Sequence, residues 1–284
     1  MNGDGIQVLG INKISSGRMG NRLFHYHFLR QIARKTGIDY FHKRFPESAY
    51  FEDMGKKSRP FWPLKKTIRL TSREVLTFIP DDFLTYIMKE IAKGTNILFD
   101  PPMLGEVFFD YLFYSPDEFI KIKPEYRKEF SFESANKKVI GIHFRGTDFP
   151  KWNIHAALKF PYYKTAIEFC LDEFRSDNPV FVLFTDDKKY PAYLETITFL
   201  KSLGENFYLG KTDNLPIYDF YQMSQCDVLI SSPSTFAIFA GCIGKPKKII
   251  HDKNWLDYAV NRNDIFWVKL NKTFNPYYSL WKAF

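Results

Sequence analysis

The order of short apolar stretches and amphipathic stretches in the second half of the chain constrains the fold more than any other feature. We predict strands at residues 139–143, 179–184, 206–209, 227–230 and 248–251, with helices between them at 161–174, 190–202, 215–225 and 236–243. Strands that alternate with helices of this length form parallel sheets, since each helix carries the chain back to the edge where the next strand starts. The pattern therefore predicts an α/β fold in which residues 248–251 form the last strand.

The start of the chain shows a shorter version of this pattern. A strand at residues 6–11 is followed by a glycine loop at 16–21, a helix at 22–35 and a strand at 38–41. Gly37 lies where the helical spacing of apolar residues stops, so we expect the helix to end there.

The segment between the two α/β patterns is harder to interpret. Residues 42–95 are basic and interrupted by prolines, so we expect loops and short helices, including one at 82–93. The polar segment 131–138 is the predicted linker between an N-terminal domain at residues 1–135 and a C-terminal domain at 136–284.

Composition narrows the classes of partner and compartment. The formal net charge of +8 suits an anionic partner such as a phosphorylated substrate, a membrane surface or a nucleic acid, although it also serves simple solubility. Cys170, Cys226 and Cys242 lie far apart without metal-ligand spacing, so we expect neither a zinc site nor a disulfide framework. No signal peptide or membrane-spanning apolar run is visible, and we expect a cytoplasmic protein whose basic patches can touch a membrane surface.

Three of the predicted strands end in polar residues rather than in ordinary turn residues. They are His143, Arg145 and Asp148, then Thr185, Asp186 and Asp187, then Ser231, Ser232, Ser234 and Thr235. In a parallel sheet these ends lie on one edge, where ligands bind. Arg145 can donate two parallel hydrogen bonds to a phosphate, and the helix that starts after Ser234 offers backbone N–H groups to an anion. Because carboxylates suit hydroxyls and ring N–H groups, the set predicts a site for a nucleotide diphosphate.

Each of these residues also has a simpler structural interpretation. Arg145 and Asp148 can form an ion pair that ties the strand to its loop, and Ser234 can be an ordinary helix N-cap. Asp186 and Asp187 can cap the next helix, and Asp219 can be a solvated helix residue.

Other nucleotide motifs are weak or missing. Gly17 and Gly20 precede a helix, and Asp39 follows at the distance of a ribose contact, but the spacing G-x-G-x-x-G of dinucleotide sites is absent. The phosphate loop G-x-x-x-x-G-K-[ST] and the metal motif H-E-x-x-H do not occur either.

Four motifs in order resemble those of the GDP-fucose-dependent fucosyltransferase superfamily, and the α-1,2-fucosyltransferase family in particular. The loop Gly17-x-x-Gly20-Asn21-x-x-Phe24-x-Tyr26 is similar to that family's glycine-rich loop, and His143-x-Arg145-x-x-Asp148 to its H-x-R-x-x-D motif. Residues 184–187 resemble its F-S-D-D segment, and residues 219–237 its third motif, which ends in a Ser-rich turn and a helix. Together the motifs span residues 17–244, whereas residues 42–130 add little to the resemblance.

The resemblance implies a GT-B glycosyltransferase, in which two Rossmann-like domains face a cleft. The N-terminal domain with its glycine loop is then the acceptor side, the C-terminal domain binds the GDP-sugar, and a final helix packs back on the N-terminal domain. The resemblance further implies inverting, metal-independent transfer of L-fucose from GDP-fucose to a hydroxyl of a glycan acceptor, with an α-1,2 linkage and without a cofactor. The partners are then GDP-fucose and a glycan, and not a nucleic acid. Such an enzyme fits the biosynthesis of a surface polysaccharide.

The resemblance also assigns roles to single residues. Arg145 is expected to hold the β-phosphate, and His143 and Asp219 to lie beside the guanine. The remaining donor contacts come from the Ser-rich turn, from the acidic pair and from the glycine loop of the other domain, namely Ser234, Thr235, Phe236, Asp186, Asp187, Gly17, Gly20 and Asn21.

The chain departs from its relatives at two positions. Gly146 stands where many relatives have a second arginine, and Asn153 stands where some α-1,6 enzymes have an acidic base. The general base therefore stays open among Asp148, His155, Glu106 and Asp110, of which we place Asp148 with Arg145 in the catalytic set. The aromatic cluster at residues 108–114 is either a sugar-stacking wall or core.

Three other functions remain open. The fold can serve another nucleotide sugar, or the chain can be an inactive lectin-like relative. The basic residues 55–73 also suggest a nucleic-acid binder, but that interpretation does not explain the polar strand ends.

Overall fold

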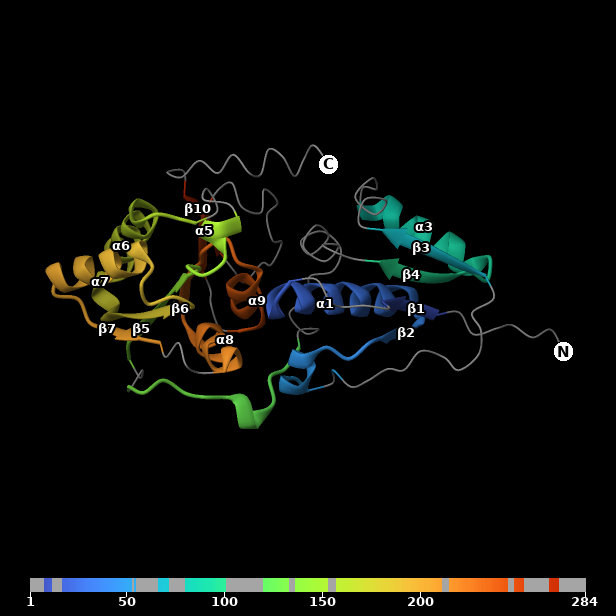
Figure 1. Cartoon of the computed structure of the whole chain (residues 1–284), viewed down its shortest axis with the longest axis horizontal. Helices are drawn as coiled ribbons and strands as arrows, with labels where there is room; N and C mark the ends of the chain where they lie inside the picture. Colours follow the sequence, from blue (N-terminus) through green and yellow to red (C-terminus); the bar gives the residue numbers. More distant parts are fainter. Residues whose placement is uncertain are drawn as a thin grey trace. The chain divides into compact units, whose positions relative to one another are not determined.

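The computed structural model describes residues 8–11, 17–52, 54, 66–71, 80–100, 120–132, 136–152, 157–210, 215–244, 248–252 and 266–270. The chain divides into two compact units, Met1–Lys121 and Ile122–Phe284 (Figure 1).

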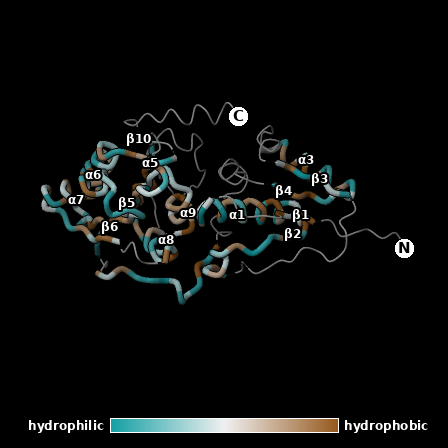
Figure 2. The backbone as a smooth tube through the Cα atoms, in the orientation of Figure 1, coloured by the Kyte–Doolittle hydropathy of each residue, from teal (hydrophilic) through white to brown (hydrophobic). Residues whose placement is uncertain are grey.

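The first unit contains a four-stranded sheet in the order β2-β1-β4-β3, and all of its strand pairs are parallel. The strands are β1 (Val8–Ile11), β2 (Asp39–His42), β3 (Thr67–Thr71) and β4 (Asn96–Asp100). The central strands β1 and β4 are buried and largely hydrophobic (Figure 2). Helices α1 (Met19–Thr36) and α3 (Pro80–Ala92) and the 3-10 turn η1 (Pro46–Tyr50) complete the described part of the unit.

Helix α1 is buried along most of its length and packs against β1 and β2. It ends as predicted, because Gly37 adopts φ 69° and its N–H bonds to the carbonyls of Ala33 and Arg34. The expectation of only loops and short helices at residues 42–95 is wrong, since β3 lies there and β4 begins directly after. β3 is an edge strand with one buried residue, Leu70, so its sequence carries little of the alternation that marks a strand. The helix predicted at 82–93 is confirmed as α3.

The second unit contains a six-stranded parallel sheet in the order β10-β9-β8-β5-β6-β7. The strands are β5 (Lys138–Phe144), β6 (Pro179–Thr185), β7 (Phe207–Leu209), β8 (Val228–Ile230), β9 (Lys248–Asp252) and β10 (Phe266–Leu270). The five predicted strands and their parallel arrangement are confirmed. The prediction that residues 248–251 form the last strand is wrong, because β10 follows and pairs with β9 at the sheet edge.

Helices cover this sheet in two groups. α6 (Phe160–Phe174) and α7 (Pro191–Ser202) contact each other and share a core with Ile140, Ile142 and Phe144 of β5. α8 (Pro216–Gln225) and α9 (Thr235–Ile243) contact each other, and Gly141 of β5 approaches Cys226 at the end of α8. Alternate residues of β5 therefore point to opposite faces. The short helix α5 (Phe149–Trp152) and the 3-10 turns η3 (Pro124–Tyr126) and η4 (Arg175–Asp177) lie in connecting segments.

The two units divide at Lys121/Ile122 rather than at the linker predicted near residue 135. Residues 122–132 belong to the second unit because they bind its surface. Glu129 accepts hydrogen bonds from the Tyr221 hydroxyl (2.8 Å) and the Gln222 side-chain amide (2.9 Å), and Phe132 stacks on Tyr208 at 4.0 Å. The prediction of a final helix that packs on the N-terminal domain concerns the C-terminal end of the chain, which lies outside the described residues. Within the described residues, no helix has the length and apolar character to cross a membrane.

Candidate functional site

The carboxyl ends of the central strands in the second sheet bring polar side chains together. β5 lies between β6 and β8, so the residues after it reach the ends of both neighbours. His143 bonds to Ser232 after β8, and Gly146 and Thr147 bond to Asp186 after β6. The predicted convergence of three polar strand ends is therefore present.

Arg145 is held in a fixed plane by two carboxylates. Its Nε and Nη2 atoms donate to Asp148 at 2.7 Å each, and its Nε lies 3.3 Å from Asp186. The guanidinium also packs over the Phe149 ring at 5.5 Å, and the side chain is 12% exposed. The ion pair that ties strand to loop is thus present. Among the described residues, this pair uses the Nε–H group and one N–H group of Nη2, so both N–H groups of Nη1 and the second one of Nη2 can reach a further acceptor.

Asp186 connects the ends of β5 and β6. Its carboxylate accepts from the backbone N–H groups of Gly146 (2.7 Å) and Thr147 (3.2 Å) and from the Thr147 hydroxyl (2.6 Å). Both oxygens are used in this way, so in this structure Asp186 shapes the loop that carries Arg145. Thr147, whose hydroxyl completes the connection, was not among the predicted site residues.

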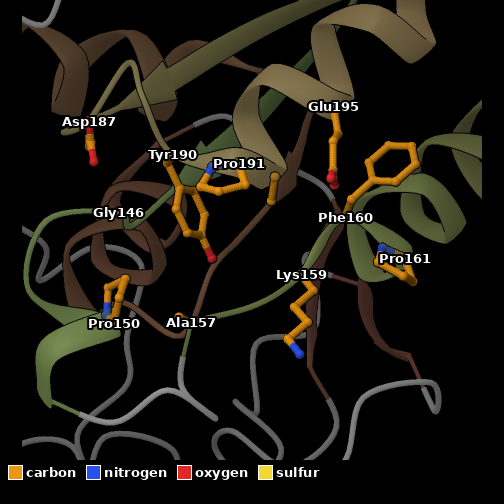
Figure 3. A pocket seen from close by; sticks show the side chains of 11 residues that line it. Gly146, Pro150, Ala157, Lys159, Phe160, Pro161, Asp187, Tyr190, Pro191 and Glu195 are labelled. Carbon is orange, nitrogen blue, oxygen red and sulfur yellow. The ribbon is translucent and has the colours of Figure 1, made fainter.

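Asp187 forms a turn rather than a helix cap. Its carboxylate accepts from the N–H of Lys189 at 2.8 Å, and its N–H donates to the Thr185 hydroxyl at 3.0 Å. The residue that precedes α7 is Tyr190, so the capping interpretation of Asp187 is wrong. Its side chain lies at a pocket beside the loop of Gly146 (Figure 3).

His143 is a buried, neutral imidazole. Burial is the main cause that lowers its pKa from 6.5 to about 3; the nearby Arg145 charge also lowers it, while Asp186 opposes the shift. Its Nδ1 lies 2.7 Å from the Ser232 hydroxyl, and its ring lies 6.0 Å from that of Phe236. A neutral imidazole can offer one donor and one acceptor, which suits recognition of a base edge.

The N-terminus of α9 lies after β8, at the same edge of the sheet. Ser234 is the N-cap residue and is buried, yet among the described residues its hydroxyl makes no capping bond to the helix. The ordinary N-cap interpretation is therefore wrong for its side chain. Thr235 and Phe236 begin the helix, and Phe236 also contacts Phe220 at 5.2 Å, next to Asp219 in the first turn of α8.

A fourth polar strand end escaped the sequence prediction. β9 ends in His251 and Asp252, which are both buried. Tyr162 fixes this region, since its hydroxyl lies within bonding distance of the Ser231 carbonyl (2.8 Å) and the Ile250 carbonyl (3.2 Å). The signal was available, because a His-Asp pair after an apolar strand follows the same pattern as the other three ends.

The glycine loop belongs to the first unit. Gly17 has φ 74°, a conformation that favours glycine, and Gly20 and Asn21 lie in the first turn of α1. Arg22, which follows them, makes two hydrogen bonds of 2.7 and 2.8 Å to the Glu47 carboxylate. The Arg22–Glu47 pair ties the start of α1 to η1.

Several predicted residues lie outside the described part of the chain. They are Glu106, Asp110, Asn153, His155 and the aromatic cluster at 108–114. Across the ranges that are described, no group of three or more His, Cys, Asp or Glu side chains has the geometry of a metal site.

The fold is shared with solved fucosyltransferase structures. A point mutant of FUT1 from Arabidopsis thaliana, in complex with GDP, aligns with a TM-score of 0.55 at 12% identity, over 92% of this chain and 72% of that one. POFUT1 in complex with GDP-fucose aligns with a TM-score of 0.55 at 12% identity, over 86% of this chain and 98% of that one. At this level of identity the likeness concerns the fold. A comparison with curated protein sequences gives no match.

The family follows from the sequence match. The model of glycosyl transferase family 11 matches residues 106–271, which is more than half of the chain. The chain therefore belongs to glycosyl transferase family 11, and the resemblance to the fucosyltransferase superfamily is confirmed at that level.

Proposed function

We propose that the protein is an inverting, metal-independent GT-B fucosyltransferase that moves L-fucose from GDP-fucose to a glycan hydroxyl and forms an α-1,2 linkage. The observation that carries the proposal is the convergence of Arg145, His143 and the N-terminus of α9 at one sheet edge in a member of this family. The complexes of FUT1 with GDP and of POFUT1 with GDP-fucose support the choice of donor.

Arg145 stabilises the leaving group in this proposal. As the bond between C1 of fucose and the β-phosphate oxygen breaks, negative charge develops on the phosphate. A guanidinium already fixed by Asp148 and Asp186 can meet that charge without reorganising, which is the main advantage of a prepared electrostatic site. The backbone N–H groups after Ser234 add a second source of positive potential at a helix N-terminus.

His143 and Asp219 take the guanine side of the site. The neutral His143 imidazole and the Asp219 carboxylate offer an acceptor pattern that suits the N–H groups of guanine rather than a phosphate. Phe236, which is half-buried near His143 and packs against the fully buried Phe220, supplies apolar surface for a planar base.

Asp148 acts as a positioning residue for Arg145. Both of its carboxylate oxygens accept hydrogen bonds from the guanidinium, so we assign the acceptor proton to another group and no longer place Asp148 among the candidate bases. The new bond forms at C1 on the face opposite the departing phosphate, and the acceptor hydroxyl loses its proton as it attacks.

A donor assay tests the proposal. The purified protein is incubated with GDP-fucose and a panel of glycans, with and without EDTA, and release of GDP and fucosylated product are measured. We expect product with an inverted anomeric centre and equal rates in EDTA. Failure to consume GDP-fucose under all conditions, or loss of activity in EDTA, contradicts the proposal.

A further inference from the structure

A pocket opens beside the loop that carries Arg145, wholly within the second unit (Figure 3). Its volume of about 740 Å³ falls in the range of about 300–1,000 Å³ typical of small-molecule sites. The Arg145 loop contributes Gly146, the β6–α7 turn contributes Asp187 and Tyr190, and α6 and α7 contribute Phe160 and Glu195.

The pocket continues along α7. A second pocket of about 450 Å³ shares Phe160 and Glu195 with the first and extends past Thr198 to Ser202. We call the two pockets together the α6–α7 groove. Their shared residues make the groove one elongated surface that starts at the Arg145 loop.

The walls of the groove combine apolar surface with a polar rim. Phe160 packs edge-on against Phe199 at 5.7 Å, and Lys164 lies over the Phe199 ring at 5.6 Å. Tyr190 presents its ring, because its hydroxyl donates to the Leu158 carbonyl at 2.6 Å and so is already bonded. Glu195 and Lys159 are exposed at the rim, and Asp187 is half-buried there.

We propose that the α6–α7 groove binds the sugars of the acceptor glycan that lie beyond the one receiving fucose. The proposal rests on the proposed function and names the acceptor as an oligosaccharide of several sugars. Sugar rings present C–H faces that pack on aromatic and proline surfaces, and their hydroxyls bond to carboxylates and ammonium groups. A groove with an apolar wall and a charged rim therefore suits an oligosaccharide better than a hydrocarbon chain, because a hydrocarbon chain cannot form hydrogen bonds with the charged groups.

The position of the groove supports this occupant. Gly146 belongs both to the groove and to the loop between Arg145 and Asp148. Asp187 follows Asp186, whose carboxylate holds that same loop. A chain of sugars in the groove would thus extend away from the group that stabilises the leaving phosphate.

A blocking variant tests the groove. Glu195→Trp places a large side chain at the junction of the two pockets, on an exposed position of α7 where folding tolerates it. Saturation-transfer NMR with oligosaccharides of two and five sugars, built on an acceptor found in the donor assay or, if none reacts, drawn from its glycan panel, measures binding without any requirement for catalysis. We expect the five-sugar probe to bind the wild-type protein and to bind the variant about 10-fold more weakly. The KM of the variant for the five-sugar probe should rise about 10-fold, which corresponds to ~1.4 kcal/mol. The KM of the variant for the two-sugar probe and its rate of GDP-fucose hydrolysis should stay within about twofold of the wild-type values.

Glu168→Trp is the matched control, because Glu168 is an exposed residue of α6 outside the groove lining. Equal behaviour of the two variants, or no binding of either oligosaccharide to the wild-type protein, overturns the proposal. Binding of a prenyl phosphate in place of the sugars also overturns it and assigns the groove to a lipid. Failure of the proposed function is a separate result, since it shows as absent GDP-fucose consumption in a protein that still binds the sugars.

Discussion

At the scale of single residues, His143 gives the clearest physical expectation. The side chain is buried and neutral, with a pKa lowered to about 3 against 6.5 for the exposed group. The unfolded chain therefore binds a proton between these two values and the folded chain does not. The contribution of the neutral, buried His143 to the free energy of unfolding is fully present above about pH 6.5. It is lost as the pH falls toward 3, by up to ~1.4 kcal/mol per pH unit.

His143→Asn should remove this dependence. Between pH 7 and pH 5 the wild-type protein should lose about 2 kcal/mol of unfolding free energy relative to the variant, because only the wild-type unfolded chain takes up the histidine proton. Urea denaturation at the two pH values gives the comparison. A constant difference between the two proteins would show that His143 does not titrate as its burial implies.

A substitution at Ser234 distinguishes a role in ligand binding from a role in helix capping. Because its hydroxyl makes no capping bond within the described residues, Ser234→Ala should leave the melting temperature unchanged while weakening GDP binding about 10-fold, the value of one hydrogen bond to a charged group. Calorimetry with GDP and a thermal melt measure the two quantities. Ser176→Ala, an exposed serine that precedes β6 at the opposite sheet edge, is the control. A loss of stability of about 1 kcal/mol without a change in GDP affinity would return Ser234 to the role of an N-cap.

At the scale of elements, the β5–α5 loop depends on Gly146. A Cβ atom there would lie 2.8 Å from Cβ of Tyr190 and 2.9 Å from Cβ of Asp187. The β6–α7 turn therefore occupies the space that a side chain at position 146 would need.

Gly146→Ala should destabilise the protein by about 1–3 kcal/mol, the usual cost of overpacking, and should lower turnover because the loop holding Arg145 must shift. Urea denaturation and GDP-fucose turnover provide the two measurements. A change in unfolding free energy below about 0.5 kcal/mol would mean that the turn moves aside easily.

The sequence was sufficient for the elements with strong periodicity. Buried strands such as β5 and β6, and helices with proline near the first turn such as α6 and α7, were predictable from local pattern alone. Edge strands were not, since β3 has a single buried side chain and β10 follows the predicted end of the sheet.

Local sequence pattern also predicts only part of the candidate site. Polar residues at strand ends were predictable, because the carboxyl ends of parallel strands meet at one edge. The bonds from Gly146 and Thr147 to Asp186 were not, since they join positions about 40 residues apart through geometry that local pattern does not encode. His251 and Asp252 were overlooked although they follow the same rule.

At the scale of the whole molecule, the family membership predicts nucleotide binding, whereas the basic net charge also suits binding of RNA. Calorimetry with GDP, UDP and ADP compares the nucleotides, and we expect GDP to bind at least about 10-fold tighter, because the proposed function places His143 and Asp219 beside the guanine. A preference for UDP would assign the fold to another nucleotide sugar. Tight, salt-sensitive RNA binding without any nucleotide affinity would instead make the net charge of +8 the functional feature.

The central claim is that Arg145 stabilises the leaving phosphate of GDP-fucose. Initial rates of GDP release from GDP-fucose, measured side by side for the wild-type protein and Arg145→Ala, test it most directly. We predict a loss of about 10²-fold or more in turnover, the scale found when a key charge-stabilising donor is deleted. Turnover of GDP-fucose by Arg145→Ala at a rate close to that of the wild-type protein would contradict the account.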